Sequence, residues 1–310
     1  MAYRFMKHEA LPDAIRRVFA EEIDGAVGQL ADSKNRTQAV HEARKSIKKI
    51  RGLLRLVRTP LGAKYRPEDR YFRQAGRRLS PIRDNAVILE VFNALAAKHD
   101  ALDAAALSDI RGNLVRSRRE TPREKQTSAQ VARLLSDARA KPNLWRLENV
   151  GFDTLSPQIV AVYKRARREV KRARHSAAAE DFHNLRKRVK QHWYHLKLLE
   201  EFSDRDMKQR AGEVRDLETC LGDEHNLTIL RERIAADIET TRDRRHARHF
   251  IALIDDLAQA LRKRALEIAR PLYAAKPREF GDRLTKLCAE PQPSRKPPAV
   301  LALKTNSAVA

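Results

Sequence analysis

The sequence predicts an all-α protein made of two four-helix units related by internal duplication. Helix-forming residues dominate, and only 10 of the 310 residues are glycine. A motif of the form H-x-x-R-K-x-x-K occurs at residues 41–48 and again at residues 183–190, so its two copies are offset by 142 positions. Hydrophobic residues make up 42% of the chain, which is enough to bury cores and excludes a disordered polycation.

Four helices are expected in the first half, over residues 11–31, 37–57, 67–99 and 104–139. Apolar residues recur at i, i+4 spacing in the first of them. The second contains the first motif, and Thr37 is its expected N-cap. Pro81 should kink the third helix, because proline lacks an N–H and its ring clashes with the preceding turn. Pro122 should break the fourth helix in the same way.

A connector with proline, glycine and asparagine covers residues 142–157. It is the expected boundary between a first bundle, residues 1–150, and a second, residues 151–290. Helices are expected in the second half over residues 157–175, 179–202, 204 onward, 241–273 and 278–287. Residues 291–310 are rich in proline and basic residues, and we expect a disordered tail there.

The histidine and the cations of each motif helix share one side of that helix. Because a helix turns about 100° per residue, those of the first copy fall within a sector of roughly 120°, beside an apolar sector. The sector consists of His41, Arg44, Lys45, Lys48, Arg51 and Arg55 in the first copy and of His183, Arg186, Lys187, Lys190 and Lys197 in the second. Neither copy has a carboxylate in this sector. A solvated helix face usually mixes signs, so we interpret these ridges as binding surfaces.

The charge of the whole chain indicates the class of ligand. Lys and Arg number 64 against 41 Asp and Glu, which gives a net charge of +23. A folded protein with this charge is suited to a polyanion, such as nucleic acid, an anionic membrane or polyphosphate. No apolar run reaches membrane-spanning length, and the N-terminus has no signal-peptide core, so a cytoplasmic protein with no membrane partner is expected.

Several kinds of site are not expected. The two cysteines, Cys220 and Cys288, form neither a disulfide framework nor a zinc pattern. The chain has no G-x-x-x-x-G-K-[ST] phosphate loop and no G-x-S-x-G nucleophile elbow. Two i, i+3 histidine pairs could hold a metal, but no acidic residue or thiol completes either site at ligand spacing. These pairs are His192 with His195 and His246 with His249. We therefore expect no metal, no cofactor and no enzymatic activity.

The motifs together resemble those of the CHAD family, the conserved histidine α-helical domain. The resemblance rests on H-x-x-R-K-x-x-K-x-x-R at residues 41–51, on Arg83-Asp84-x-x-Val87, and on the second motif with Leu221-Gly222 after it. It covers residues 9–287, nearly the whole chain. The resemblance implies two four-helix bundles with pseudo-twofold symmetry around a basic central groove or pore. It also implies non-catalytic binding of inorganic polyphosphate, which can target a protein to polyphosphate granules.

The sequence departs from the family pattern in its second half. Trp193 stands at the position that corresponds to Arg51, and His225-Asn226 stands where the first copy has Arg83-Asp84. Asp84 could orient the basic ridge of the first copy as an acidic partner, and the second copy has no acidic residue at the matching position. The chain contains no E-x-E, so it resembles a stand-alone form without the triphosphate-tunnel domain that some relatives carry.

Two alternatives stay open at this point. The same basic surface would serve a nucleic-acid-binding protein, although aromatic residues are only 5% of the chain, which argues against base stacking. A histidine-dependent phosphate-polymer enzyme or a metal binder is weaker, because no general base or magnesium-binding acidic cluster accompanies the histidines. His41 and His183 could bind phosphate oxygens as neutral donors or only order neighbouring arginines.

Overall fold

The computed structural model describes residues 3–31, 35–98, 104–116, 122–241 and 243–288. Within these ranges the side chains of residues 83–86, 104–106, 116, 122–123, 240 and 288 are not described. All regular structure in the described ranges is helical, as the sequence predicts. The predicted tail at residues 291–310 lies outside them.

The first half contains seven α-helices and two short 3₁₀ turns among its described residues. The helices are α1 (Leu11–Ala31), α2 (Arg36–Leu56), α3 (Arg58–Leu61), α4 (Tyr65–Arg78), α5 (Ser80–Ala96), α6 (Ala104–Arg116) and α7 (Pro122–Ala138), and the turns are η1 (Gly62–Lys64) and η2 (Lys141–Leu144). In the second half, the described residues form α8 (Phe152–Ser176), α9 (Ala179–Leu198), α10 (Arg205–Ala236), α11 (Arg244–Leu272) and α12 (Pro277–Cys288), with turns η3 (Glu200–Phe202) and η4 (Ile238–Thr240).

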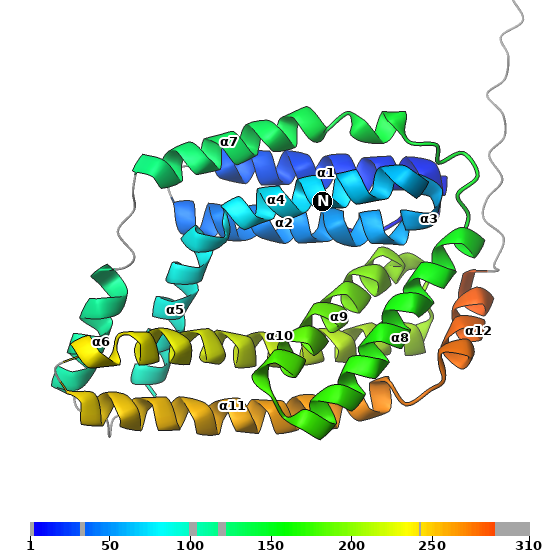
Figure 1. Cartoon of the computed structure of the whole chain (residues 1–310). Helices are drawn as coiled ribbons and strands as arrows, with labels where there is room; N and C mark the ends of the chain where they lie inside the picture. The colour runs from blue at the N-terminus through cyan, green and yellow to red at the C-terminus, as the bar shows by residue number, and fades with distance from the viewer. Residues whose placement is uncertain (1–2, 32–34, 99–103, 117–121, 242, 289–310) are drawn as a thin grey trace, which may run out of the picture.

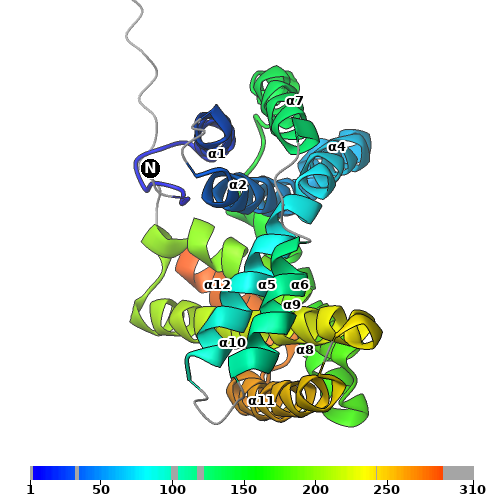
Figure 2. The same cartoon turned by 90° about the vertical axis from the view of Figure 1, so that its left-hand side faces the viewer.

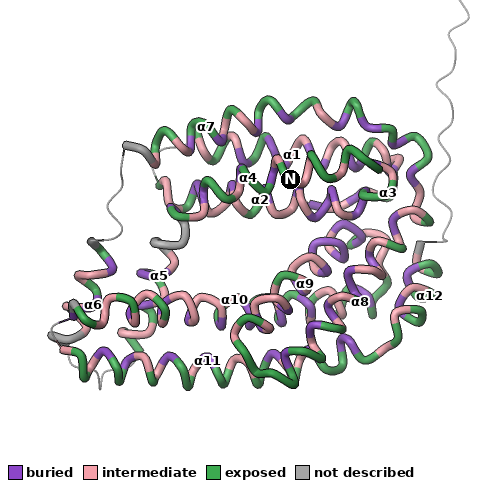
Figure 3. Tube along the Cα trace, viewed as in Figure 1, coloured by how far each residue is buried: buried purple, intermediate pink, exposed green. Residues whose placement is uncertain are grey.

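The helices form two groups that lie one above the other in Figures 1 and 2. Helices α1, α2, α4 and α7 make one group, in which α2 packs on both α1 and α4. Helices α8 to α12 make the other, in which α9 packs between α8 and α10. Helix α5 leaves the first group and contacts α2, α10 and α6, so it joins the two groups. Figure 3 shows that α7 and α11 each expose one side along their length.

The hydrophobic packing crosses the predicted division at residue 150. The larger cluster of buried residues joins Phe19 of α1 and Leu53 of α2 to Phe182 of α9. A second cluster joins α5 and α6 to α10 and α11, and within it the rings of Phe92 and Phe250 meet edge to face at 5.4 Å. Each group therefore depends on residues from both halves of the sequence. The origin of the halves by duplication stays a prediction.

Three expected helix boundaries are wrong. Helix α2 begins at Arg36, and its N-cap is Asn35 in place of Thr37, because the Asn35 side chain accepts a hydrogen bond from the Gln38 N–H at 3.1 Å. The expected kinked helix over residues 67–99 is two helices, α4 and α5, which meet at Leu79. Pro81 lies in the first turn of α5, where its missing N–H leaves no helical bond unmade.

The third wrong boundary is the start of the second half. Helix α8 begins at Phe152, and Pro157 lies inside it instead of at its start. Two other boundaries agree more closely: α7 begins at Pro122, and Asp204 caps α10 by accepting a hydrogen bond from the Met207 N–H at 2.7 Å. Among the helices that the structure describes, none combines the length and the apolar character needed to cross a bilayer.

Candidate anion-binding groove

Two adjoining cavities lie between α2 on one side and α9 and α10 on the other. The larger has a volume of about 360 Å³ and the smaller of about 160 Å³. Both are lined by Lys48, Arg186, Lys190 and Tyr194, so together they form one continuous hollow, the basic groove. The predicted site residues that line it are His41, Arg44, Lys45, Lys48, Arg51, Arg55, Arg186, Lys187 and Lys190. Side chains from both motif ridges thus line the same groove, whereas His183 and Lys197 are not part of its lining.

A close contact between α2 and α9 brings the ridges together. Gly52 of α2 faces Tyr194 of α9, and a Cβ added at Gly52 would be 3.3 Å from the Tyr194 Cβ and 3.2 Å from the Tyr3 hydroxyl. His195 Nε2 donates a hydrogen bond to the Gly52 carbonyl at 3.1 Å. Burial lowers the pKa of His195 to about 4, so the ring is neutral at neutral pH. The contact is therefore a tight and uncharged crossing beside the cations.

Lys48 and Arg186 lie at the centre of the groove and line both of its cavities. Neither side chain makes an ion pair or hydrogen bond with any side chain that the structure describes, and Arg186 Nε is a buried donor. Burial is the main reason that the pKa of Lys48 falls to about 7, and Lys190, Arg44 and Arg186 lower it further by repulsion. The Arg186 guanidinium lies over Gly222, where a Cβ would be 3.8 Å from Nε. An anion at this centre would relieve both the repulsion and the unmade hydrogen bonds.

Other groove cations have partners that hold them in place. Lys190 pairs with Glu218 of α10 at 2.6 Å, and Arg51 forms a two-pronged pair with Asp69 of α4 at 2.9 and 3.1 Å. Carboxylates therefore reach the groove from neighbouring helices, and Glu218 supplies the acidic partner that the second ridge lacked in the sequence. Four residues at the groove were not predicted as part of the site: Asp69 and Glu218, which pair with its cations, and Asp223 and His225, which line it.

Arg44 and Lys45 differ in their partners. Arg44 Nη1 donates to the Gly76 carbonyl at 3.1 Å and to the Ser80 hydroxyl, which are neutral acceptors. Lys45 pairs with Glu42, one turn earlier on α2, at 3.1 Å. These two acceptors hold the Arg44 side chain at the wall of the groove.

The two motif histidines occupy different positions. His41 lines the groove directly, whereas the His183 ring lies 4.5 Å from the ring of His225, which lines it. Burial lowers the pKa of His183, with further lowering by Lys187 and Arg186, and burial and Arg186 lower that of His225 to about 3. His183 Nδ1 is buried without a hydrogen-bond partner among the described residues. Both rings are therefore neutral at pH 7 and suited to donate to an anion through an N–H.

Two side chains of α9, Lys197 and Tyr194, are not exposed cations of the groove. Lys197 does not line the groove; its ammonium lies 5.7 Å from the centre of the Trp193 ring. Tyr194 is buried, and its hydroxyl has no hydrogen-bond partner among the described groups. The side chains of Arg83 and Asp84 lie outside the described residues.

The structure also locates the residues considered as metal ligands or reactive thiols. Within the described ranges, no group of three or more histidine, cysteine or acidic side chains is placed to hold a metal ion. His192 is buried in the core, and its Nδ1 lies 3.0 Å from the Tyr273 hydroxyl. Cys220 is a buried free thiol that donates to the Leu261 carbonyl at 3.3 Å, and burial raises its pKa.

Comparisons with known proteins identify the family and the fold of the chain. A family model described as CHAD domain matches residues 14–235, a range that contains both motifs. The crystal structure of the CHAD domain from the plant Ricinus communis superposes with a TM-score of 0.57 at 16% sequence identity, covering 89% of this chain and 94% of that one. At this identity the superposition shows a shared fold. No curated protein matches the chain.

Proposed function

The chain belongs to the CHAD domain family, and on that premise we propose that it binds inorganic polyphosphate in the basic groove as a binder and not as an enzyme. The observation that carries the proposal is the pair Lys48 and Arg186, two cations at the centre of the groove without an anionic partner among the described residues. Keeping such groups partly buried and unpaired costs free energy, and an anionic ligand offsets that cost.

The chemistry of polyphosphate suits the groove. It is an unbranched polyanion without bases, so its recognition needs a row of cations and no hydrogen-bond code. Arg186 offers a planar fork to phosphate oxygens, and Lys48 offers a mobile point charge. Arg51 and Lys190 are held in place by carboxylates and therefore lose little conformational freedom when the ligand arrives.

Nucleic acid is the competing ligand, because a net charge of +23 attracts any polyanion. One observation favours it: Trp193 lines the groove, and an unpaired base could stack on an indole ring. Competition between polyphosphate and DNA, both duplex and single-stranded, decides between the two. Displacement of bound polyphosphate by DNA at equal phosphate concentration would favour nucleic acid.

The main test compares two double variants with the same change of formal charge. Lys48→Gln with Arg186→Gln removes the two unpaired groove cations. Lys125→Gln with Arg133→Gln removes two exposed cations on α7, a helix that contributes no residue to the groove. At fixed salt, we expect the groove variant to lose about tenfold or more in polyphosphate affinity and the α7 variant to stay within about twofold. Equal losses of affinity in the two variants would mean that polyphosphate binding depends on the total charge of the protein and not on the groove.

Two further measurements complete the test. The wild-type affinity should fall log-linearly with salt concentration, because binding releases counterions from the polyphosphate. Free phosphate should not accumulate when the protein is incubated with polyphosphate; its steady release would indicate an enzyme. In cells, a fluorescently tagged protein should collect on polyphosphate granules, and the groove variant should not.

A further inference from the structure

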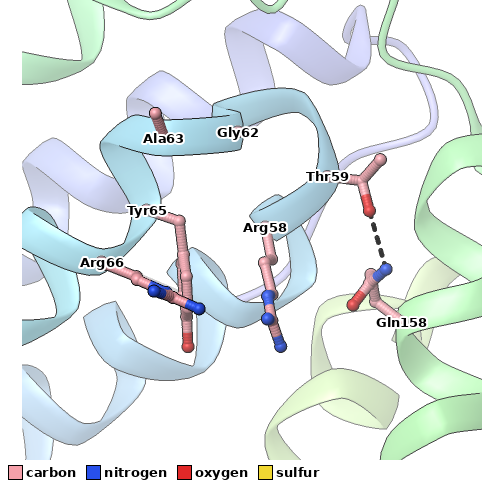
Figure 4. Close-up of a pocket in the computed structure, with 7 residues that line it drawn as sticks. All are labelled: Arg58, Thr59, Gly62, Ala63, Tyr65, Arg66 and Gln158. Atoms are coloured by element: carbon pink, nitrogen blue, oxygen red, sulfur yellow. Dashed lines mark hydrogen bonds between the residues drawn. The ribbon is translucent and has the colours of Figure 1, made fainter.

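A third cavity lies beyond the C-terminal end of α2. It has a volume of about 650 Å³, and Figure 4 shows the side chains that line it. They come from α3, η1, the start of α4 and α8, and are Arg58, Thr59, Gly62, Ala63, Tyr65, Arg66 and Gln158. Gln158 Nε2 donates to the Thr59 hydroxyl at 2.8 Å, so α8 closes one side of the cavity.

The turn between α3 and α4 brings two arginines to the same cavity. Gly62 has φ of +52°, a conformation that favours glycine, and it lets the chain reverse there. As Figure 4 shows, Arg58, Tyr65 and Arg66 then extend toward the same side. The Arg58 guanidinium lies 5.2 Å from the centre of the Tyr65 ring, a cation–π contact that orients it without neutralising it.

Both arginines of the cavity are exposed. Neither the Arg58 nor the Arg66 side chain makes an ion pair or a hydrogen bond with another described residue, whereas some exposed arginines do meet carboxylates, as Arg139 does with Asp24. Other exposed arginines, such as Arg70 and Arg77, are also unpaired among the described residues, so the distinguishing feature here is that two such side chains line one cavity. Within the described part of the chain, no carboxylate neutralises either charge.

The cavity lies close to the end of the basic groove, although the two share no lining residue. Asp69 of α4 holds Arg51 and Arg55, the last groove cations along α2, at 2.9 and 3.7 Å. Asp69 is one helical turn from Tyr65, so the two share a face of α4. Burial chiefly lowers the pKa of Arg55, Arg51 lowers it further, and Tyr65 is close enough to raise it. The end of the groove and the aromatic ring of the cavity are thus neighbours.

We infer that this cavity is a second subsite for the same polyphosphate chain, with Arg58 and Arg66 as its phosphate-binding residues. The inference rests on the proposed function, since it extends the ligand path of the groove. Lys48 is eight residues before Leu56, the last residue of α2, which at 1.5 Å per residue is roughly 12 Å along that helix, and Arg58 lies beyond this end on α3. A triphosphate bound at Lys48 and Arg186 is too short to reach Arg58, whereas a long chain extends into the cavity.

The experiment uses the full chain and two ligands, tripolyphosphate and long-chain polyphosphate. The variant Arg58→Glu with Arg66→Glu is compared with Lys125→Glu with Arg133→Glu, which changes the net charge equally on α7. For long chains, we expect the cavity variant to lose about tenfold or more in affinity. The slope of log affinity against log salt concentration should also become shallower, by the amount that corresponds to about two lost phosphate contacts. For tripolyphosphate, both variants should stay within about twofold of the wild type.

The possible results separate the subsite from the groove. The subsite is wrong if the cavity variant and the α7 variant have the same affinity for long chains. It is also wrong if the cavity variant loses as much affinity for tripolyphosphate as for long chains. Neither result would contradict binding in the groove. If the wild type binds neither ligand, the proposed function itself is wrong. Arg58→Gln with Arg66→Gln is the second variant, and circular dichroism and thermal unfolding establish that the variants compared are folded.

Discussion

At the scale of single residues, Lys48 is the most informative side chain. Its ammonium is crowded by other cations, and the repulsion and burial that lower its pKa to about 7 exist because the groove brings Arg186 and Lys190 of α9 against α2. A lysine with this pKa is only partly charged at neutral pH. Bound phosphate favours the charged form, so Lys48 links ligand binding to proton uptake.

The pH dependence of binding follows from this linkage. Below pH 7 Lys48 is already protonated and binding needs no proton; above pH 7 binding must take one up. We therefore expect polyphosphate affinity to fall as the pH rises from 7 to 9, by up to about tenfold per unit. Lys48→Arg should flatten this fall, because arginine stays charged throughout.

The measurement is a dissociation constant at constant ionic strength across that pH range. Terminal phosphates of the ligand titrate over the same range in both experiments, so the difference between the two proteins isolates Lys48. The same pH dependence in wild type and Lys48→Arg would show that Lys48 does not bind the ligand as an ammonium.

At the scale of elements, the crossing of α2 and α9 sets the width of the groove. Gly52 is the residue that permits it, because a Cβ there would press on both Tyr194 and Tyr3. The hydrogen bond from His195 to the Gly52 carbonyl fixes the same point. The helices that present the cations are therefore held by glycine, tyrosine and a neutral histidine, and not by the cations themselves.

Substituting Gly52 tests this role. Gly52→Ala should destabilise the protein by about 1–3 kcal/mol through overpacking, despite alanine's better helix propensity. Gly28→Ala on α1 is the matched control: no atom lies within 4 Å of a Cβ there, so it should stabilise by up to about 1 kcal/mol. Urea unfolding of both variants gives the two changes in the free energy of unfolding. Equal changes would mean that the crossing of α2 and α9 accommodates an extra methyl group without strain.

At the scale of the whole molecule, the two halves of the chain share their cores. Helices α5 and α6 pack against α10 and α11, and the larger core joins α1 and α2 to α8 and α9. The groove lies at this junction, with one wall from each half. We therefore expect both binding and folding to require the two halves together.

Separating the halves should show this dependence. A fragment of residues 1–150 would expose Ile88, Leu89 and Phe92 of α5, which are buried against the second half. We expect it to lose helical signal or to aggregate, and to bind polyphosphate weakly. Mixing it with a fragment of residues 151–310 should restore helicity and binding, as followed by circular dichroism and size-exclusion chromatography. A monomeric and cooperatively folded fragment 1–150 would mean that the halves are independent domains.

By itself, the sequence determined the helical class, most helix positions and the set of cations that share one side of each motif helix. These are local properties, because helix periodicity and capping depend on residues within a few positions of one another. Errors at this level are local too: Asn35 caps α2 two residues before the expected cap, Thr37, and Pro81 lies in the first turn of α5 instead of kinking a longer helix.

Only the tertiary structure decided which of those cations meet and which remain unpaired. Asp69 and Glu218 reach Arg51 and Lys190 from other helices, Lys197 falls beside Trp193 and outside the groove, and Lys48 and Arg186 keep no partner among the described residues. The physical reason is that ion pairing and burial depend on distances between segments far apart in the chain. A helical repeat in the sequence carries no information about those distances.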